Sequence, residues 1–267
     1  MLRRLDAELV RRGLARSRDD ARSLVDSGLV LVDGVVAVKV TRQVSDSVSL
    51  VVSSNEAKWV SRGAHKLLGA LEAFKPLGLN LRGRVVLDAG ASTGGFTQVC
   101  LAENVSQVVA VDVGYGQLAW PVRTDPRVIV MERFNVRNLS KADLKVDVDL
   151  VVADLSFISL VTVLPALVSS TTEDADLVLM VKPQFEVGKA DIGDGIVRSP
   201  ELRASAVERV ISEAQKIGAG FRAVGASPLP GPQGNVEYFV WLTKGFPVID
   251  GEQCAIAVQT AIEEGPQ

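Results

Sequence analysis

The chain has 267 residues, of which 47% are hydrophobic and 23% charged, and its formal net charge is −3. These values are ordinary for a folded globular protein and exclude a disordered or fibrous chain, and the length leaves room for about two domains. Two cysteines and a single histidine exclude a disulfide framework and leave few ligands for a metal ion, so we expect no metal cofactor.

The average charge hides an asymmetry along the chain. The first 22 residues hold seven arginines against four acidic residues, whereas residues 53–267 hold 20 basic and 25 acidic residues. A polyanion would therefore meet the N-terminal end first. The same end carries charged residues where a secretory signal peptide needs an apolar core, so we expect a cytoplasmic protein.

The N-terminal segment is predicted to form two short helices and a small β unit. Apolar side chains recur at helical spacing over residues 2 to 12, and Ser17 can cap a second helix that Gly28 ends. Asp33-Gly34 between two apolar runs predicts a hairpin, because this pair tolerates the positive φ angles of a tight turn. Residues 1–54 form a compact module of an RNA-binding type, and residues 55–61 fit a linker.

Residues 62–267 are predicted to form an α/β domain. Strands are expected at 85–88, 108–112, 128–131, 150–154, 177–181, 221–226 and 236–242, and helices from 61, near 200–217 and at 252–264. Alternating strands and helices indicate a parallel sheet with right-handed crossovers. The later strands are nearly all apolar, as expected when helices cover both faces.

One uncharged stretch, residues 155–172, reaches the usual length of a membrane-spanning helix. It also contains seven hydroxyl residues and Pro165, which favour a loop followed by a buried helix. We therefore expect no membrane span, and we expect a monomer.

A glycine-rich loop lies between the first strand of the sheet and the next helix. Glycines let a backbone approach a ligand closely, and the helix that follows offers free N–H groups. Asp112 ends the next strand, where a carboxylate can accept both hydroxyls of a ribose, and Asn135 follows the third strand, where it can help to hold an adenine. The pattern favours S-adenosylmethionine over a nicotinamide cofactor or a plain tight turn. The loop comprises Asp88, Ala89, Gly90, Ala91, Ser92, Thr93, Gly94, Gly95 and Phe96.

Charged residues also stand at the ends of apolar strands. Asp154 ends the fourth strand, Lys182 ends the fifth, and Glu237 lies in the seventh. A buried charge is costly unless it is paired or used, and the carboxyl ends of parallel strands line the ligand crevice. Lys66, on the helix before the sheet, completes a Lys-Asp-Lys-Glu set. Two structural salt bridges are the alternative interpretation.

This set resembles the catalytic tetrad of ribose 2′-O-methyltransferases of the FtsJ type. The N-terminal segment resembles an S4 RNA-binding domain, and the whole chain resembles the TlyA, or haemolysin-A, family. Ala57 departs from that family, which commonly has arginine two positions before the tryptophan that corresponds to Trp59. The stretches that carry the resemblance are 13–18, 61–67, 88–96, 154–159, 181–189 and 234–239.

The resemblance implies a class I, Rossmann-like methyltransferase domain of seven strands. It implies S-adenosylmethionine-dependent 2′-O-methylation of cytidines in 16S and 23S ribosomal RNA, which affects susceptibility to capreomycin-type antibiotics. Lys182 would take the 2′-hydroxyl proton, or hold the ribose as a cation, while Lys66, Asp154 and Glu237 orient it. Asp154 would also border the cofactor.

Nine basic residues are candidates for RNA contacts, and arginine suits them because its planar group binds phosphate in a bidentate way. A solvated charged face is the alternative for each. We expect the target nucleotide to be flipped out, because a stacked ribose is poorly accessible. The candidates are Arg3, Arg4, Arg16, Arg18, Lys39, Arg42, Arg62, Arg133 and Lys189.

Three other functions compete with a methyltransferase. A membrane-active haemolysin needs an amphipathic or spanning element, and no convincing one is found. A pseudouridine synthase also often carries an S4 domain, but the glycine-rich loop argues against it. A non-catalytic ribosome-binding module would not need the complete tetrad.

Overall fold

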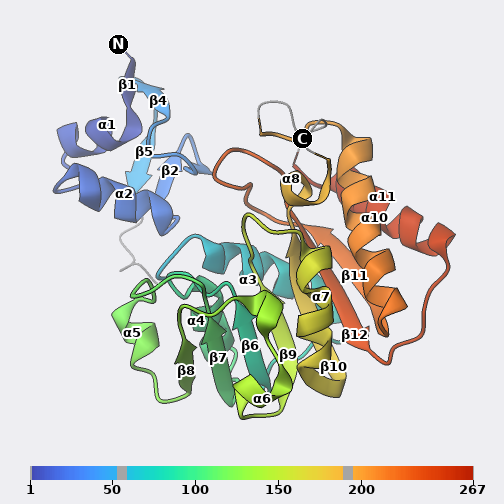
Figure 1. Ribbon diagram of the computed structural model, residues 1–267. Helices are drawn as coiled ribbons and strands as arrows, with labels where there is room; N and C mark the ends of the chain where they lie inside the picture. The colour runs from blue at the N-terminus through green and yellow to red at the C-terminus, as the bar shows by residue number, and fades with distance from the viewer. Residues whose placement is uncertain (1, 53–58, 189–194, 267) are drawn as a thin grey trace.

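The structure, a computed structural model, describes residues 2–52, 59–188 and 195–266 (Figure 1). The first two helices and five strands form a small unit that lies beside a larger α/β unit. Most of the expected linker, including Ala57, and the RNA-contact candidate Lys189 lie outside the described residues.

The small unit has its own apolar core, built around Leu5, Leu9, Val25 and Val30. Strand β1 pairs antiparallel with β4, and β2 lies between β3 and β5. The elements are β1 (Leu2–Arg4), α1 (Leu5–Arg11), α2 (Arg18–Asp26), β2 (Val30–Val32), β3 (Val35–Val36), β4 (Gln43–Ser45) and β5 (Leu50–Val52).

Local signals in this unit are confirmed. The Ser17 side chain accepts a hydrogen bond from the Asp20 backbone N–H and caps α2, and Gly28 adopts a φ of 71° after the helix. Asp33 and Gly34 turn between β2 and β3 with positive φ angles. The helix expected from residue 2 is wrong at its start, because residues 2–4 form β1 and pair with β4.

A buried carboxylate holds the end of α1. Glu8 is 1% exposed, and its Oε1 lies 2.5 Å from Arg11 Nη2 and 2.7 Å from Arg12 Nε. Hydrogen bonds from Arg11 and Arg12 lower the pKa of Glu8 from 4.5 to about 2. Glu8 therefore stabilises the fold fully above its ordinary pKa, and this stability is lost as the pH falls from about 4.5 through 2.

We expect Glu8→Gln to lower the melting temperature of the full chain at pH 7 and to lessen the further loss on acidification. The reason is that glutamine carries no charge to protonate, so one source of acid sensitivity disappears. Melting followed by circular dichroism between pH 7 and 3 measures this, with the exposed Glu72→Gln variant as control. Equal acid sensitivity in wild type and Glu8→Gln would contradict the assignment.

The larger unit alternates helices and strands. Its helices include α3 (Gly63–Phe74), η1 (Lys75–Leu77), α4 (Gly95–Ala102), α5 (Trp120–Arg123), η2 (Val136–Asn138), α6 (Lys141–Leu144), α7 (Leu160–Ser169), α8 (Pro183–Glu186), α10 (Pro200–Lys216) and α11 (Gly251–Glu264). Its strands are β6 (Val85–Ala89), β7 (Gln107–Val111), β8 (Val128–Met131), β9 (Val148–Ala153), β10 (Thr171–Val181), β11 (Ala219–Ala226) and β12 (Tyr238–Lys244).

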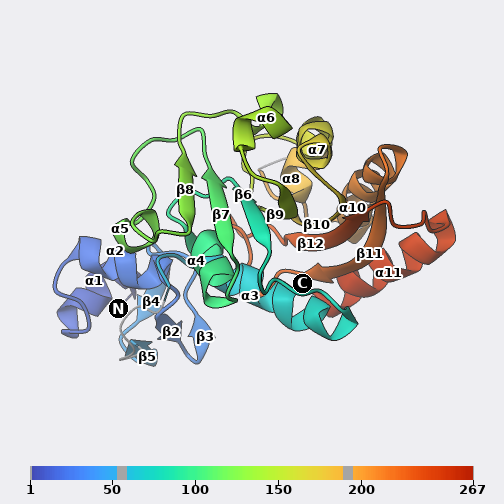
Figure 2. The ribbon, with the colours of Figure 1, turned by 90° about the horizontal axis from the view of Figure 1, so that it is seen from below.

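These strands form one seven-stranded sheet with the order β11-β12-β10-β9-β6-β7-β8. Two apolar cores lie on its faces: α7, α10 and α11 cover one, and α3 and α4 cover the other (Figure 2). The expected parallel sheet is confirmed except for β12, which runs antiparallel to β10 and β11. Residues 227–237 between β11 and β12 contain no helix that could carry a crossover.

The uncharged stretch from residue 155 forms a loop, the helix α7 and the first residues of β10. Val163, Leu164 and Leu167 of α7 are buried against the sheet. No helix in the described residues is long and apolar enough to cross a membrane. The interpretation as a loop followed by a buried helix is confirmed.

Candidate active site

The glycine-rich loop joins β6 to α4 at the carboxyl edge of the sheet. Gly90 and Gly94 have φ angles of 87° and 95°, and Ser92 has a φ of 48°. A Cβ at Gly90 would lie 2.6 Å from the backbone oxygen of Asp154. Only glycine therefore lets the loop after β6 pack directly on the loop after β9.

Asp88 lies beneath this loop and is completely buried. Its Oδ2 accepts a 2.6 Å hydrogen bond from Thr97 Oγ1 on α4, and burial raises the pKa of Asp88 to about 7. It does not line the cavities described below. Asp88 therefore lies where it can support the loop, and it does not lie where a ligand in these cavities would contact it.

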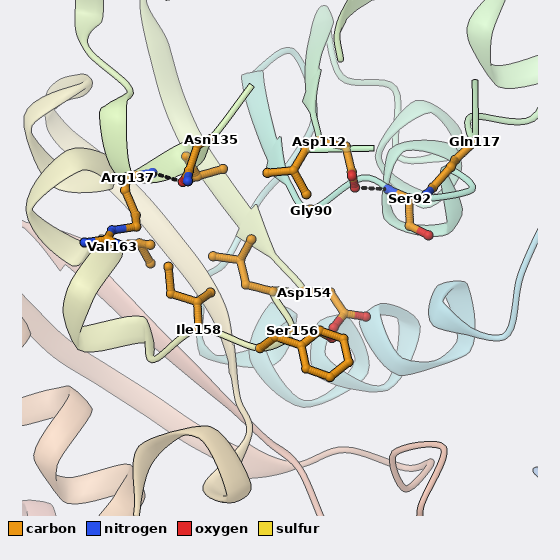
Figure 3. A pocket seen from close by; sticks show the side chains of 14 residues that line it. Gly90, Ser92, Asp112, Gln117, Asn135, Arg137, Asp154, Ser156, Ile158 and Val163 are labelled. Carbon is orange, nitrogen blue, oxygen red and sulfur yellow. Dashed lines mark hydrogen bonds between the residues drawn. The ribbon is translucent and has the colours of Figure 1, made fainter. Parts of the chain in front are cut away.

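The first cavity, of about 560 Å³, opens beside the loop (Figure 3). This size is within the range of small-molecule sites, roughly 300–1,000 Å³. Asp112 stands in its wall, with Oδ2 accepting from Ser92 N at 2.8 Å and Oδ1 from Gly114 N at 2.7 Å. Two backbone donors thus fix the carboxylate and leave its remaining lone pairs for ribose hydroxyls.

The opposite wall of the first cavity is part polar and part apolar. Asn135 Oδ1 accepts a hydrogen bond from Arg137 N at 3.0 Å, which orients the side-chain amide (Figure 3). Leu155, Ile158 and Val163 supply apolar surface. A carboxylate at one end and an apolar wall with an amide at the other match the ribose and the base of an adenosine group.

Other loop residues face a second cavity of about 320 Å³, which shares Gly90, Ser92 and Asp154 with the first. Gly94 packs under Leu118 instead. Five of the expected cofactor residues line the first cavity: Gly90, Ser92, Asp112, Asn135 and Asp154. Four more line the second cavity: Ala91, Thr93, Gly95 and Phe96.

The four tetrad residues form two ion pairs, of which Lys66–Glu237 is buried and Lys182–Asp154 is partly exposed through Asp154. Lys66 Nζ on α3 lies 2.5 Å from Glu237 Oε2, and Lys182 Nζ lies 2.6 Å from Asp154 Oδ1. Lys66 and Lys182 are 4% and 6% exposed, and Glu237 is 1% exposed. The sequence predicts that Glu237 lies within the last strand, but in the structure it immediately precedes β12.

The two pairs border two cavities that share Lys182. Lys66, Asp154 and Lys182 line the second cavity, while Lys182 and Glu237 line a third cavity of about 350 Å³. Lys182 Nζ also donates a 2.8 Å hydrogen bond to Ser156 Oγ, while its contact with Asp154 lacks hydrogen-bond alignment. The structure thus brings the tetrad together around the second and third cavities, and Asp154 also lines the first.

Glu186 is a residue of this region that the sequence did not single out. It is 4% exposed, and it accepts hydrogen bonds from Ser159 Oγ at 2.5 Å and from Leu160 N at 2.6 Å. The Ser159 side chain does not cap α7, so Glu186 performs the capping from α8. It ties the loop after β9, which forms one wall of the first cavity, to the helix α8 that follows Lys182.

We expect Glu186→Ala to lower the free energy of unfolding by about 2 kcal/mol, because a buried N–H and a hydroxyl lose their acceptor. The Kd for S-adenosylmethionine should rise as well, since the wall of the first cavity loses its anchor. Urea unfolding and calorimetric titration measure the two effects. The exposed Glu72→Ala variant on α3 is the control, and equal stability of the two variants would contradict this role.

The basic RNA-contact candidates differ in their surroundings. Arg3 forms an ion pair with Asp46, and Arg4 forms one with Asp6 at 2.8 Å. Arg133 lies over the Tyr115 ring, 4.2 Å from its centroid. The candidates with exposed side chains and no ion pair within the described part of the chain are Arg16, Arg18, Arg42 and Arg133.

Two other candidates join the domains. Arg62 Nη1 donates to the Val38 oxygen at 3.1 Å, and Lys39 Nζ donates to the Gln233 oxygen at 3.2 Å. These contacts, together with the approach of His65 to Gly28, set the small unit against the first turns of α3. Because α3 carries Lys66, the small unit is directly connected to the tetrad.

Comparisons with known proteins agree with both units. Residues 59–244 match the model of the FtsJ-like methyltransferase family, and residues 3–47 match that of the S4 domain. The chain is 57% identical over 266 residues to a Mycobacterium tuberculosis protein named 16S/23S rRNA (cytidine-2'-O)-methyltransferase TlyA, covering 98% of each chain.

Two further similarities carry a different name. The chain is 34% identical to Hemolysin A of Brachyspira hyodysenteriae, covering 88% of this chain and 97% of the other. A solved structure titled "Putative hemolysin from Streptococcus thermophilus" matches with a TM-score of 0.75 at 34% identity, covering 98% of this chain and 96% of the other.

Proposed function

Because the chain belongs to the FtsJ-like methyltransferase family and to the TlyA group within it, we propose that it methylates the ribose 2′-oxygen of cytidines in ribosomal RNA. The observation that carries the proposal is the convergence of Lys66, Asp154, Lys182 and Glu237 beside the first cavity. A transferase needs its acceptor and its methyl donor side by side, and the adjoining cavities provide that arrangement.

S-adenosylmethionine is the methyl donor that the first cavity fits, and it supplies a methyl group activated by a sulfonium charge. Asp112 would hold its ribose hydroxyls, Asn135 and the apolar wall would hold its adenine, and Gly90 would allow close approach to the backbone. Asp88 and Gly94 would support the loop from behind. The protein's contribution is alignment and charge placement.

The reaction proposed is an in-line displacement. The donor would supply its methyl group to the 2′-oxygen and leave as S-adenosylhomocysteine, and Lys182 Nζ would take up the 2′-hydroxyl proton. Lys182 Nζ is held by Asp154 and Ser156 at the meeting point of the cavities. It therefore is the residue that contacts the 2′-hydroxyl, while Lys66 and Glu237 position the nucleotide.

The scope of the substrate is proposed from the Mycobacterium tuberculosis relative, whose name gives both 16S and 23S RNA. Modification of both subunits would affect susceptibility to capreomycin-type antibiotics and would take place in the cytoplasm. The S4 domain would dock the RNA through Arg16, Arg18 and Arg42, with Arg133 nearer the first cavity. Binding should weaken steeply with salt, because phosphate contacts release counterions.

The test is transfer of labelled methyl from S-adenosylmethionine to purified 30S and 50S subunits that lack the modification. We expect label in the RNA of both subunits, and none without the enzyme. Label in one subunit would narrow the scope, and label in neither would refute the proposal. Leakage from liposomes, measured with the same preparation, tests the haemolysin alternative.

A further inference from the structure

Three of the thirteen aromatic side chains lie exposed, and all three follow strands at the carboxyl edge of the sheet: Tyr115 and Phe157 in loops, and Trp120 at the start of α5. Tyr115 is 68% exposed, Trp120 is 73% exposed and Phe157 is 91% exposed. Aromatic rings normally bury their large apolar area, so an exposed set beside a ligand cavity indicates a binding surface. Phe157 lines the first and third cavities, whereas Tyr115 and Trp120 lie outside them.

The segment that carries Tyr115 and Trp120 is held in place by hydrogen bonds. Gly114 O accepts from Arg133 N at 3.0 Å, and Gly116 N donates to Glu132 Oε1 at 2.9 Å. Glu132 Oε1 also forms an ion pair with Arg123 of α5. The two aromatic side chains are therefore exposed on an ordered backbone.

A positive charge accompanies the rings. The Arg133 guanidinium lies 4.2 Å from the centroid of Tyr115, and Arg133 has a φ of 56°, which non-glycine residues rarely adopt. No ion pair of Arg133 is found in residues 2–52, 59–188 and 195–266. The charge is thus available to an anionic partner.

The surroundings identify that partner. Helix α5 lies at the same side of the larger unit as the small unit (Figure 1), whose helix α2 carries the exposed arginines Arg18 and Arg22. On the other side, Ala119 N donates to Thr93 O of the glycine-rich loop at 3.1 Å. The segment that carries Tyr115 and Trp120 thus adjoins the glycine-rich loop of the proposed site, at the side of the larger unit where the basic S4 domain lies.

We propose that Tyr115, Trp120 and Arg133 form a stacking surface for unpaired bases of the RNA substrate that flank the methylated nucleotide. Every base has a π face that stacks on aromatic rings and on guanidinium groups, and flipping a nucleotide leaves its neighbours unstacked. This inference rests on the proposed function, because it assumes an RNA substrate at the first cavity.

Tryptophan fluorescence tests the surface directly. Trp59 and Trp241 are 7% and 3% exposed, so a stacking base reaches Trp120. Titration with an unmodified 23S rRNA transcript should quench the emission of the wild type. Trp120→Phe should lose most of the quenching yet bind the transcript with nearly the same Kd, since phenylalanine still stacks. Unchanged quenching in Trp120→Phe would overturn the inference.

Kinetics give a second readout. Trp120→Ala and Tyr115→Ala should each raise the KM for ribosomal subunits about tenfold, within the range found for loss of one stacked base. The Kd for S-adenosylmethionine should not change, and Ile256→Ala, which alters an exposed apolar side chain on α11, should behave as wild type. Equal KM values in all variants would contradict the inference of a stacking surface but would not contradict the proposed function. A wild type that transfers no methyl group would refute the proposed function itself.

Discussion

Lys182→Ala is expected to reduce methyl transfer by roughly 10³-fold or more, in the range of a lost proton-transfer group. Lys182 Nζ lines the second cavity and is fixed by Asp154 and Ser156, which line both the first and the second cavity. Alanine leaves no group there that can take a proton or hold a 2′-oxygen. Initial rates with saturating S-adenosylmethionine and purified subunits measure the loss.

The Kd for S-adenosylmethionine should stay within about twofold in Lys182→Ala, because Lys182 does not line the first cavity. Lys216→Ala removes a surface lysine that pairs with its helix neighbour Glu213, and it should behave as wild type. If Lys182→Ala kept most of the methyl-transfer activity, the proposed role of the tetrad in the reaction would be contradicted.

Glu237→Ala is expected to destabilise the protein by about 3–5 kcal/mol, as for other buried ion pairs that lose one partner. Lys66 is 4% exposed, and its Nζ forms its ion pair with Glu237. Without that carboxylate an ammonium group remains buried and uncompensated. Urea unfolding measures the change.

The double variant Lys66→Met/Glu237→Leu separates stability from catalysis. An apolar pair of similar size restores much of the lost stability, because no charge remains buried. Methyl transfer by the double variant should be undetectable, since two of the four tetrad residues are missing. A double variant that recovers activity together with stability would show that Lys66 and Glu237 form only a structural ion pair.

Much of the fold follows from local sequence signals. Ser17 offers an acceptor that caps a helix, and Asp33-Gly34 allows a primed turn. The apolar runs of the sheet are long enough to be predicted as strands. These features act within a few residues, so the sequence alone expresses them. The glycine-rich loop belongs to the same class, because positive φ angles at Gly90 and Gly94 need glycine.

Other features depend on distant partners and escape such signals. Residues 2–4 form β1 because Leu2 pairs with Ser45, a contact across the whole small unit. The direction of β12 depends on the missing crossover helix. The spacing of apolar residues predicts neither the strand β1 nor the direction of β12, since it indicates only which face of a segment is buried.

The site shows the same division. Asp112, Asn135, Asp154 and Lys182 could be named from strand ends, because parallel strands end at one edge. Lys66 comes from the helix before the sheet, and Glu237 from the last strand expected. Glu186 could not be named, since its partners Ser159 and Leu160 lie 27 and 26 residues before it and meet it only in the fold. Arg62 also contacts a different partner from the one expected, because its position beside the small unit depends on how the domains pack.

The most direct measurement is the identity of the modified nucleoside. Subunits are incubated with the enzyme and deuterium-labelled S-adenosylmethionine, the RNA is digested to nucleosides, and mass spectrometry locates the label. The expected product is cytidine that carries the labelled methyl group on its ribose, and Lys182→Ala should form none. A labelled methyl group on a base, or a labelled ribose product in equal amount from Lys182→Ala, would contradict a tetrad that acts on the 2′-oxygen.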